Sequence, residues 1–225
     1  MDVRNAFLHG DLTETVYMKQ PAGFIDKDHP DHVCLLHKSL YGLKQALRAW
    51  FDKFSNFLLE FGFFCSIPDP SLFICAKNND VIFLLLYVDD MVITGNPSAL
   101  LNSLLEELNK QFWMKDLGQL HYFLGIQAHF HPGSLFLSQQ KYAEDLLITA
   151  AMANCSPVAT PLPQQLSKAP NHHKLFDNPK YFRSLAGKLQ YLTLTRPDVQ
   201  FSVNYVCQKM HASTVSDFQL LKRIL

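Results

Sequence analysis

Several common sequence signals are missing from this chain of 225 residues. Lysine plus arginine and aspartate plus glutamate balance at 20 each, so the net charge neither supports nor excludes a locally basic nucleic-acid groove. Only five cysteines occur, with no C-x-x-C pair, which argues against a zinc module and against a secreted disulfide framework. We therefore expect reduced thiols in an intracellular protein, in a cytoplasmic particle or the nucleus.

Long apolar segments and nucleotide-binding loops are missing as well. The apolar run at 81–88 is far shorter than the roughly 18 residues that a membrane-spanning helix needs, and charged residues follow it directly. Neither a G-x-S-x-G nucleophile elbow nor a G-x-x-x-x-G-K phosphate loop occurs. The N-terminal stretch lacks the apolar centre of a signal peptide. We expect no membrane association.

The sequence is rich in material for a folded core, because 48% of its residues are hydrophobic and 18 are phenylalanine. Apolar residues at three- and four-residue steps predict helices over 39–61, 98–112, 139–152, 181–195, 198–210 and 216–225. Between them, β-rich runs and turn residues predict short strands and two hairpins, at 72–95 and 120–137. Strands with interspersed helices, followed by helices alone, indicate an α+β fold with a helical appendage.

Residues 81–95 combine an eight-residue apolar run with two adjacent carboxylates, Asp89 and Asp90. The run and the Gly-Asn-Pro that closes it predict two short buried strands joined by a tight turn at the acidic pair. Neighbouring carboxylates between buried arms repel each other and lose water, a cost that a bound cation offsets. A solvated Asp-Asp turn is the alternative, because aspartate favours turns.

Four stretches, at 2–12, 39–50, 87–90 and 115–126, resemble the ordered motifs of copia-type LTR-retrotransposon reverse transcriptases. They read DVRNAFLHGDL, SLYGLKQALRAW, YVDD and KDLGQLHYFLGI. Two later stretches, YFRSLAGKLQYL and TRPD, are also similar to that polyprotein. A YxDD alone is a weak signal, whereas four motifs in this order are specific, and the resemblance covers nearly the whole chain.

The resemblance implies a right-hand polymerase, whose palm is an antiparallel sheet packed on helices. We expect the palm and the start of the thumb in 1–153, a proline-rich linker in 154–180, and in 181–225 a helical connection segment leading toward a ribonuclease H domain. The fingers are expected to be truncated. The implied activity is RNA-directed DNA polymerase, a nucleotidyl transfer that uses an RNA or DNA template-primer and deoxynucleoside triphosphates.

The chain starts one residue before the first motif aspartate, within the strand that should carry it. We therefore expect a fragment with weak polymerase activity or none. The alternative is a non-catalytic retrotransposon remnant that at most binds nucleic acid or a protein partner.

By the same resemblance, the catalytic and metal-binding residues are Asp2, Asp89 and Asp90. Asp2 and Asp89 would bridge two Mg²⁺ ions, which Mn²⁺ can replace, and Asp90 would assist from the same turn. Phe7 resembles the steric gate that selects deoxynucleotides, because a ring there clashes with a 2'-hydroxyl. A plain core phenylalanine is the alternative interpretation.

Further contacts are implied by the remaining motifs. Lys115 resembles a lysine that protonates pyrophosphate, with a solvated loop lysine as the alternative. Tyr87 suits contact with the primer end, or is an ordinary strand aromatic. The resemblance assigns nucleotide or template contacts to Tyr41, Gly42, Gln45, Tyr87 and Lys115, and primer contacts to Phe123, Leu124 and Gly125.

Two histidine pairs are weaker candidates. His129 and His131 would share one strand face, but no third metal ligand is near them in sequence. His172 and His173 lie in the predicted linker. We interpret both pairs as non-functional.

Overall fold

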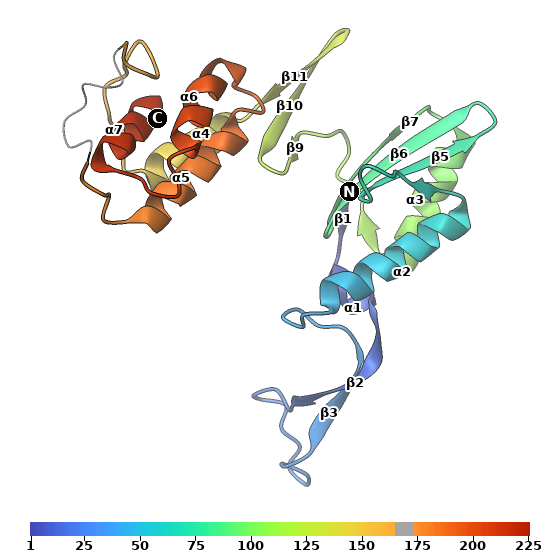
Figure 1. Cartoon of the computed structure of the whole chain (residues 1–225). Coiled ribbons are helices and arrows are strands. Elements are labelled where there is room, and N and C mark those ends of the chain that lie inside the picture. Colours follow the sequence, from blue (N-terminus) through green and yellow to red (C-terminus); the bar gives the residue numbers. More distant parts are fainter. Residues whose placement is uncertain (165–172) are drawn as a thin grey trace. The chain divides into compact units, whose positions relative to one another are not determined.

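The computed structural model describes residues 1–164 and 173–225 (Figure 1). The chain forms two compact units, Met1–Leu120 and His121–Leu225, and each is described by itself. The predicted linker at 154–180 belongs to the second unit, and its residues 165–172, which include His172, lie outside the described residues. No helix in the described part of the chain is long and apolar enough to cross a membrane.

The first unit is built on a six-stranded sheet in the order β4-β5-β6-β7-β1-β8, and every strand pair is antiparallel. The central hairpin is β6 with β7, and two short strands, β1 and β8, complete one side. The strands are β1 Asp2–Val3, β4 Phe64–Cys65, β5 Leu72–Lys77, β6 Asp80–Tyr87, β7 Asp90–Gly95 and β8 Met114–Lys115. The expected mixture of helices with an antiparallel sheet is therefore confirmed.

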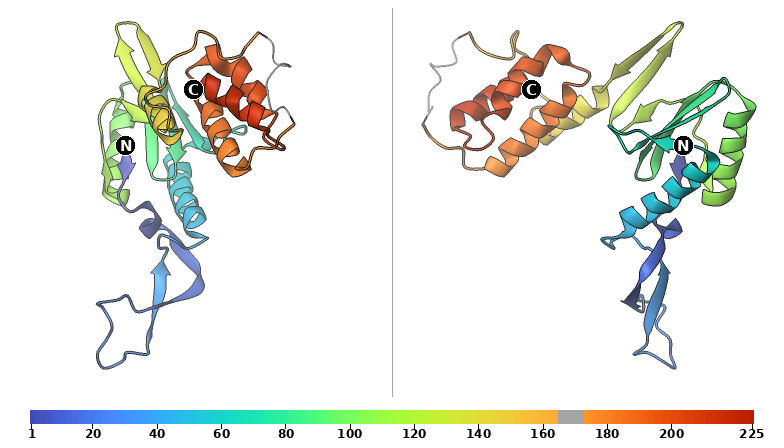
Figure 2. Two further views of the ribbon diagram at one scale, coloured as in Figure 1. Left: turned by 90° about the vertical axis from the view of Figure 1, so that its left-hand side faces the viewer. Right: turned by 45° about the vertical axis from the view of Figure 1, so that its right-hand side comes forward.

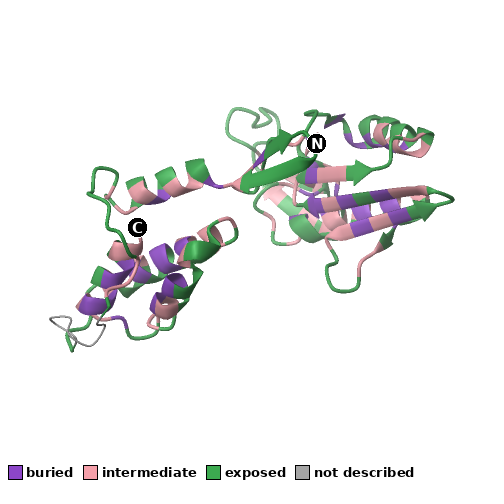
Figure 3. Ribbon diagram, turned by 90° about the horizontal axis from the view of Figure 1, so that it is seen from above, coloured by how far each residue is buried: buried purple, intermediate pink, exposed green. Residues whose placement is uncertain are grey.

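Three helices accompany this sheet, α1 Ala6–His9, α2 Ala46–Phe61 and α3 Ala99–Phe112 (Figure 2). Helices α2 and α3 share one core with the sheet, and the Phe54 and Phe112 rings of the two helices meet with centroids 5.3 Å apart. The core also takes alternate residues of the strands, as the banded colouring of Figure 3 shows. The fully or nearly fully buried side chains of this core include Trp50, Leu58, Phe73, Cys75, Ile82, Leu84, Leu86, Met91, Leu104 and Leu108.

The sheet is buried on one face only, which corrects the expectation that the hairpin strands are buried throughout. In β6, Ile82 and Leu84 are fully buried, while Phe83 is 39% and Tyr87 54% exposed. An antiparallel sheet with one solvated face alternates in this way because successive side chains point to opposite faces. The second face is therefore accessible where the acidic pair lies.

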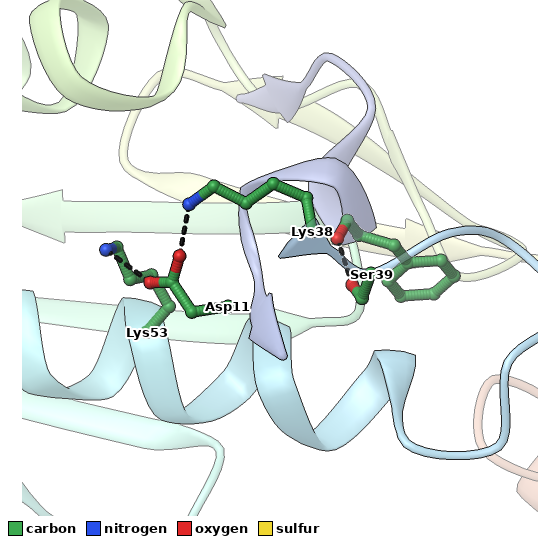
Figure 4. Close-up of polar contacts among 5 residues, drawn as sticks. Asp11, Lys38, Ser39 and Lys53 are labelled. Carbon is green, nitrogen blue, oxygen red and sulfur yellow. Dashed lines mark hydrogen bonds and ion pairs between the residues drawn. The ribbon is translucent and has the colours of Figure 1, made fainter. Parts of the chain in front are cut away.

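A two-stranded ribbon, β2 Asp11–Lys19 with β3 Val33–Lys38, extends away from the sheet (Figure 1). At its base Asp11 lies between Lys38 and Lys53, the latter on α2 (Figure 4). Hydrogen bonds from Lys38 and then Lys53 hold the pKa of Asp11 below its ordinary value of 3.8. The Ser39 hydroxyl donates to the Phe7 carbonyl, so α1 and the start of the 39–50 stretch are joined at this point.

The second unit contains a three-stranded sheet in the order β11-β10-β9 and a group of helices. The strands are β9 Tyr122–Phe123, β10 Ile126–His131 and β11 Ser134–Ser138, and the helical elements are α4 Gln140–Thr149, α5 Pro179–Leu192, η2 Pro197–Val199, α6 Gln200–Cys207 and α7 Val215–Ile224. Side chains of α4 to α7, among them Leu146, Phe182, Val203 and Leu221, form its core.

One local prediction was wrong. The helix expected from Ser39 begins at Ala46, because Gly42 takes a φ of +97° and turns occupy 41–42 and 44–45. The strand expected at Asp2 is present as β1, but it has only two residues, because Asn5 turns the chain with a φ of +54° and Ala6–His9 is a helix.

Candidate active site

The acidic pair stands at the turn of the β6–β7 hairpin. Tyr87 pairs with Asp90 across the hairpin, so Val88 and Asp89 form a two-residue loop. Val88 has a φ of +58°, a left-handed conformation that is unusual for a β-branched residue. The buried Trp50 indole donates a hydrogen bond of 2.6 Å from its Nε1 to the Val88 carbonyl.

Asp2 is held within the sheet although its strand has only two residues. It pairs with Asp90 of β7 on one side and with Lys115 of β8 on the other. The Val3 N–H donates to the Asp89 carbonyl at 3.1 Å, and the Met91 N–H donates to the Met1 carbonyl at 3.1 Å. Lys115 is thus part of a strand beside Asp2, and not in a loop as its alternative interpretation assumed.

Four predicted residues form one row across the accessible face of the sheet. The strand register gives the order Tyr87, Asp90, Asp2, Lys115, and residues directly opposite each other in antiparallel strands project from the same face. On the other face, Leu86 lies opposite Met91 and Val3 lies opposite Met114, and all four side chains are buried.

The three carboxylates share an unfavourable electrostatic environment. Partial burial, followed by the charges of Asp89 and Asp2, raises the pKa of Asp90 above its usual 3.8, against the opposing effect of the Met1 ammonium. Burial, followed by the same two charges, also raises the pKa of Tyr41. Negative potential therefore concentrates around Asp2, Asp89 and Asp90, and a cation bound there would relieve it.

Two aromatic rings lie close to this negative potential. The Phe7 and Tyr41 rings meet with centroids 4.5 Å apart, and Phe7 is half-buried against the core of the first unit while Tyr41 is 56% exposed. Next to Tyr41, Gly42 has left-handed backbone, and no atom of the described residues lies within 4 Å of the position that its Cβ would take. The backbone at Gly42 is therefore open to close approach by a ligand.

Gln45 lies at the N-terminus of α2 and turns toward the ribbon. Its amide donates to the Glu14 carboxylate at 3.0 Å. Both residues line an open polar cleft of about 450 Å³ between β2 and α2, which Arg48 and Lys53 also line. The structure thus shows Gln45 in this cleft and shows no contact between its side chain and the carboxylate row.

The predicted primer-contact residues belong to the second unit. Leu124 and Gly125 form the two-residue turn between β9 and β10, with φ values of +48° and +83°. The Tyr191 hydroxyl of α5 donates to the Leu124 carbonyl. Phe123 pairs with Ile126 at the base of the turn. Neither Trp50 nor Tyr191 was singled out from the sequence, although both occur inside stretches that carried the resemblance.

Within residues 1–164 and 173–225, no group of three His, Cys, Asp or Glu side chains is arranged to hold a metal ion. Mg²⁺, however, is commonly held by one or two carboxylates together with substrate phosphates and water. Asp2 and Asp89, both half-buried, fit a donor set of that kind. The His129 ring is exposed, and its Nε2 lies 2.9 Å from the Ser138 hydroxyl.

Comparisons with known proteins show the family to which the chain belongs. Residues 1–164 match the family described as "Reverse transcriptase (RNA-dependent DNA polymerase)". The whole chain is 49% identical to part of the "Retrovirus-related Pol polyprotein from transposon RE1" of Arabidopsis thaliana, 46% identical to that of transposon RE2 of the same plant, and 38% identical to that of transposon TNT 1-94 of Nicotiana tabacum.

The chain spans only 15%, 16% and 18% of the lengths of these three relatives. No solved structure matches it.

Proposed function

The chain belongs to the reverse transcriptase (RNA-dependent DNA polymerase) family and corresponds to that domain of a retrotransposon Pol polyprotein, and we propose that its first unit is the palm of a right-hand polymerase of copia type. The observation that carries the proposal is the row of Asp90, Asp2 and Lys115 beside the Asp89 turn, on the solvated face of an antiparallel sheet. Carboxylates from separate strands at one point are what two-metal nucleotidyl transfer requires.

In this proposal Asp2 and Asp89 hold two divalent cations, Mg²⁺ or in its place Mn²⁺, and Asp90 assists from the adjoining position. Bound Mg²⁺ supplies a positive charge that lowers the pKa of a primer 3'-hydroxyl and neutralises a triphosphate. The raised pKa of Asp90 supports this assignment, because burial and then the nearby charges of Asp89 and Asp2 raise it, although the Met1 ammonium opposes them. Such perturbed groups cluster at functional sites.

The neighbouring residues receive roles that follow from their positions. Phe7 and Tyr41, in ring contact, form an apolar wall on which a deoxyribose rests and against which a 2'-hydroxyl clashes. Gly42 lets the backbone approach an incoming nucleotide. Lys115, opposite Asp2 in the sheet, donates a proton to the leaving pyrophosphate. Tyr87, at the other end of the row, contacts the primer end.

The remaining assignments concern the template-primer. Gln45 contacts the template from the cleft between β2 and α2, where its present partner is Glu14. The turn of Phe123, Leu124 and Gly125 contacts the primer strand, and the helices that follow correspond to the thumb and the connection segment. The substrates are an RNA or DNA template-primer and deoxynucleoside triphosphates.

Primer extension on an RNA template with Mg²⁺ tests the function. We expect Asp89→Asn to lose at least ~100-fold in rate, since removal of one preorganised charge from a transition-state site costs about that much. Glu106→Gln is the matched control, because it removes an exposed carboxylate from the outer side of α3. Equal rates for wild type and Asp89→Asn would refute catalysis at this site and favour a non-catalytic binding role.

A further inference from the structure

The turn that carries Asp89 is built on an unfavourable backbone conformation. Two-residue hairpin loops of this kind favour asparagine, aspartate and glycine at positions with positive φ. Here the first loop residue is Val88, whose φ is +58°. A β-branched residue avoids that region, so contacts from elsewhere in the chain must hold it there.

Trp50 supplies such a contact from a rigid position. Its Nε1–H donates to the Val88 carbonyl at 2.6 Å, and its side chain is 1% exposed. The indole is packed against the rings of Phe54 at 5.2 Å, Phe112 at 5.5 Å and His9 at 5.8 Å between centroids. Because aromatic neighbours surround it, the indole has a fixed position. The Val88 carbonyl must therefore lie where the indole N–H can donate to it.

The bonded carbonyl belongs to the peptide group that joins Val88 to Asp89. Fixing the plane of that peptide fixes the direction in which the Asp89 side chain leaves the backbone. On the other side of Asp89, its own carbonyl accepts the Val3 N–H at 3.1 Å. The peptide groups before and after Asp89 are therefore both anchored, one by α2 and one by β1.

We propose that the Trp50 indole N–H is a positioning group for Asp89: it holds Val88 in the left-handed conformation and so aims the Asp89 carboxylate at the divalent-cation site. The inference rests on the proposed function for the identity of that site. It goes beyond that function because it gives the buried Trp50 a role in positioning Asp89, in addition to its packing in the core.

Mn²⁺ binding to the full chain tests the inference. It is measured by electron paramagnetic resonance in the absence of nucleic acid. Trp50→Phe keeps an aromatic ring in the core and removes the donor, and we expect it to weaken Asp89-dependent Mn²⁺ binding by about 10-fold, the effect of losing roughly one hydrogen bond. Adding Val88→Gly to that variant should restore most of the affinity, because glycine adopts positive φ without cost.

A tryptophan analogue with sulfur in place of the indole N–H gives a second test if Trp50→Phe folds poorly. Only Trp50 and Trp113 occur in the chain, and Trp113 is 72% exposed, so the analogue can be incorporated in a Trp113→Phe background. This substitution preserves the shape of the ring and removes only the donor. We expect the same loss of Mn²⁺ affinity, and the same recovery with Val88→Gly.

The outcomes separate the inference from the proposed function. Unchanged Mn²⁺ affinity in the donor-less proteins, or a loss that Val88→Gly does not restore, would overturn the positioning role and leave a merely structural tryptophan. Absence of Asp89-dependent Mn²⁺ binding by the wild type would overturn it too. Asp89-dependent binding that follows the expected pattern, with no primer extension, would refute the polymerase function and leave the positioning role standing.

Discussion

Replacing Asp90 by asparagine should stabilise the folded chain at neutral pH in the absence of divalent cations. Asp90 faces Asp2 directly across the strand pair and is adjacent to Asp89 in sequence. Like charges at directly opposite positions of a sheet cost roughly 0.2–1 kcal/mol. Asp90 has two such neighbours, and the Met1 ammonium partly offsets their repulsion. Because Asp90 is exposed, solvent screens this repulsion, and we expect Asp90→Asn to raise the free energy of unfolding by about 0.5–1 kcal/mol.

The sign of the pH dependence follows from the raised pKa of Asp90. The folded chain binds the Asp90 proton more tightly than the unfolded chain, so wild-type stability falls as pH rises from 3.8 through the folded-state pKa. Above that interval the cost is constant. Asp90→Asn lacks this titration, so the two proteins should be equally stable below pH 3.8 and diverge above it.

Urea unfolding at a series of pH values, with low salt and a chelator, measures this difference. Glu106→Gln is the control, since it removes the same charge from an exposed position on α3 that does not belong to the row, and it should show no comparable gain. Adding Mg²⁺ should close the gap, because a bound cation neutralises the repulsion that the substitution removes. An Asp90→Asn chain that is less stable than wild type at neutral pH would refute the account of the site as a crowded acidic cluster whose repulsion is only partly offset.

Two further substitutions test the packing that supports the site. Gly10→Ala should destabilise the chain by about 1–3 kcal/mol in urea unfolding, because its Cβ would come within 3.0 Å of backbone atoms of Ala49 and Trp50; an unchanged unfolding midpoint would show that α2 can shift freely. Tyr191→Phe removes the hydroxyl that donates to the Leu124 carbonyl, and should speed amide exchange in the β9–β10 turn by about 5-fold, equivalent to roughly 1 kcal/mol. Unaltered exchange there would mean that the turn holds its shape without α5.

Much of the fold could be predicted wherever a local pattern decided it. The helix over 98–112 follows from its apolar spacing, and in the structure the Ser98 hydroxyl caps it by accepting the Leu101 N–H. The hairpin at 80–95 followed from its apolar run and its turn. The start of α2 was misjudged because periodicity alone does not report the left-handed backbone at Gly42.

The candidate site was harder to predict, because its strand pairing is not local. Strand β1 consists only of Asp2 and Val3 and is too short to show a periodicity. Nothing in β1 itself therefore indicates that it lies between β7 and β8. The two-residue strand that holds Lys115 gives no local signal either, for the same reason. The carboxylate pair at 89–90 could be found from sequence, whereas its alignment with Asp2 depends on a register that only the folded sheet defines.

The contacts in the first unit give a physical reason why these sequence stretches occur together. Stretch 2–12 meets stretch 39–50 where the Ser39 hydroxyl donates to the Phe7 carbonyl. Stretch 39–50 meets the 87–90 turn where Trp50 donates to the Val88 carbonyl.

The 87–90 turn meets stretch 2–12 again where Val3 donates to the Asp89 carbonyl, and the fourth stretch, 115–126, joins where Lys115 pairs with Asp2. These contacts form a closed ring, so a displacement of any one stretch alters the position of Asp2 relative to Asp89. A strand of two residues suffices for Asp2 because neighbours on both sides fix it, and the geometry of the carboxylates is a property of the ring rather than of the turn alone.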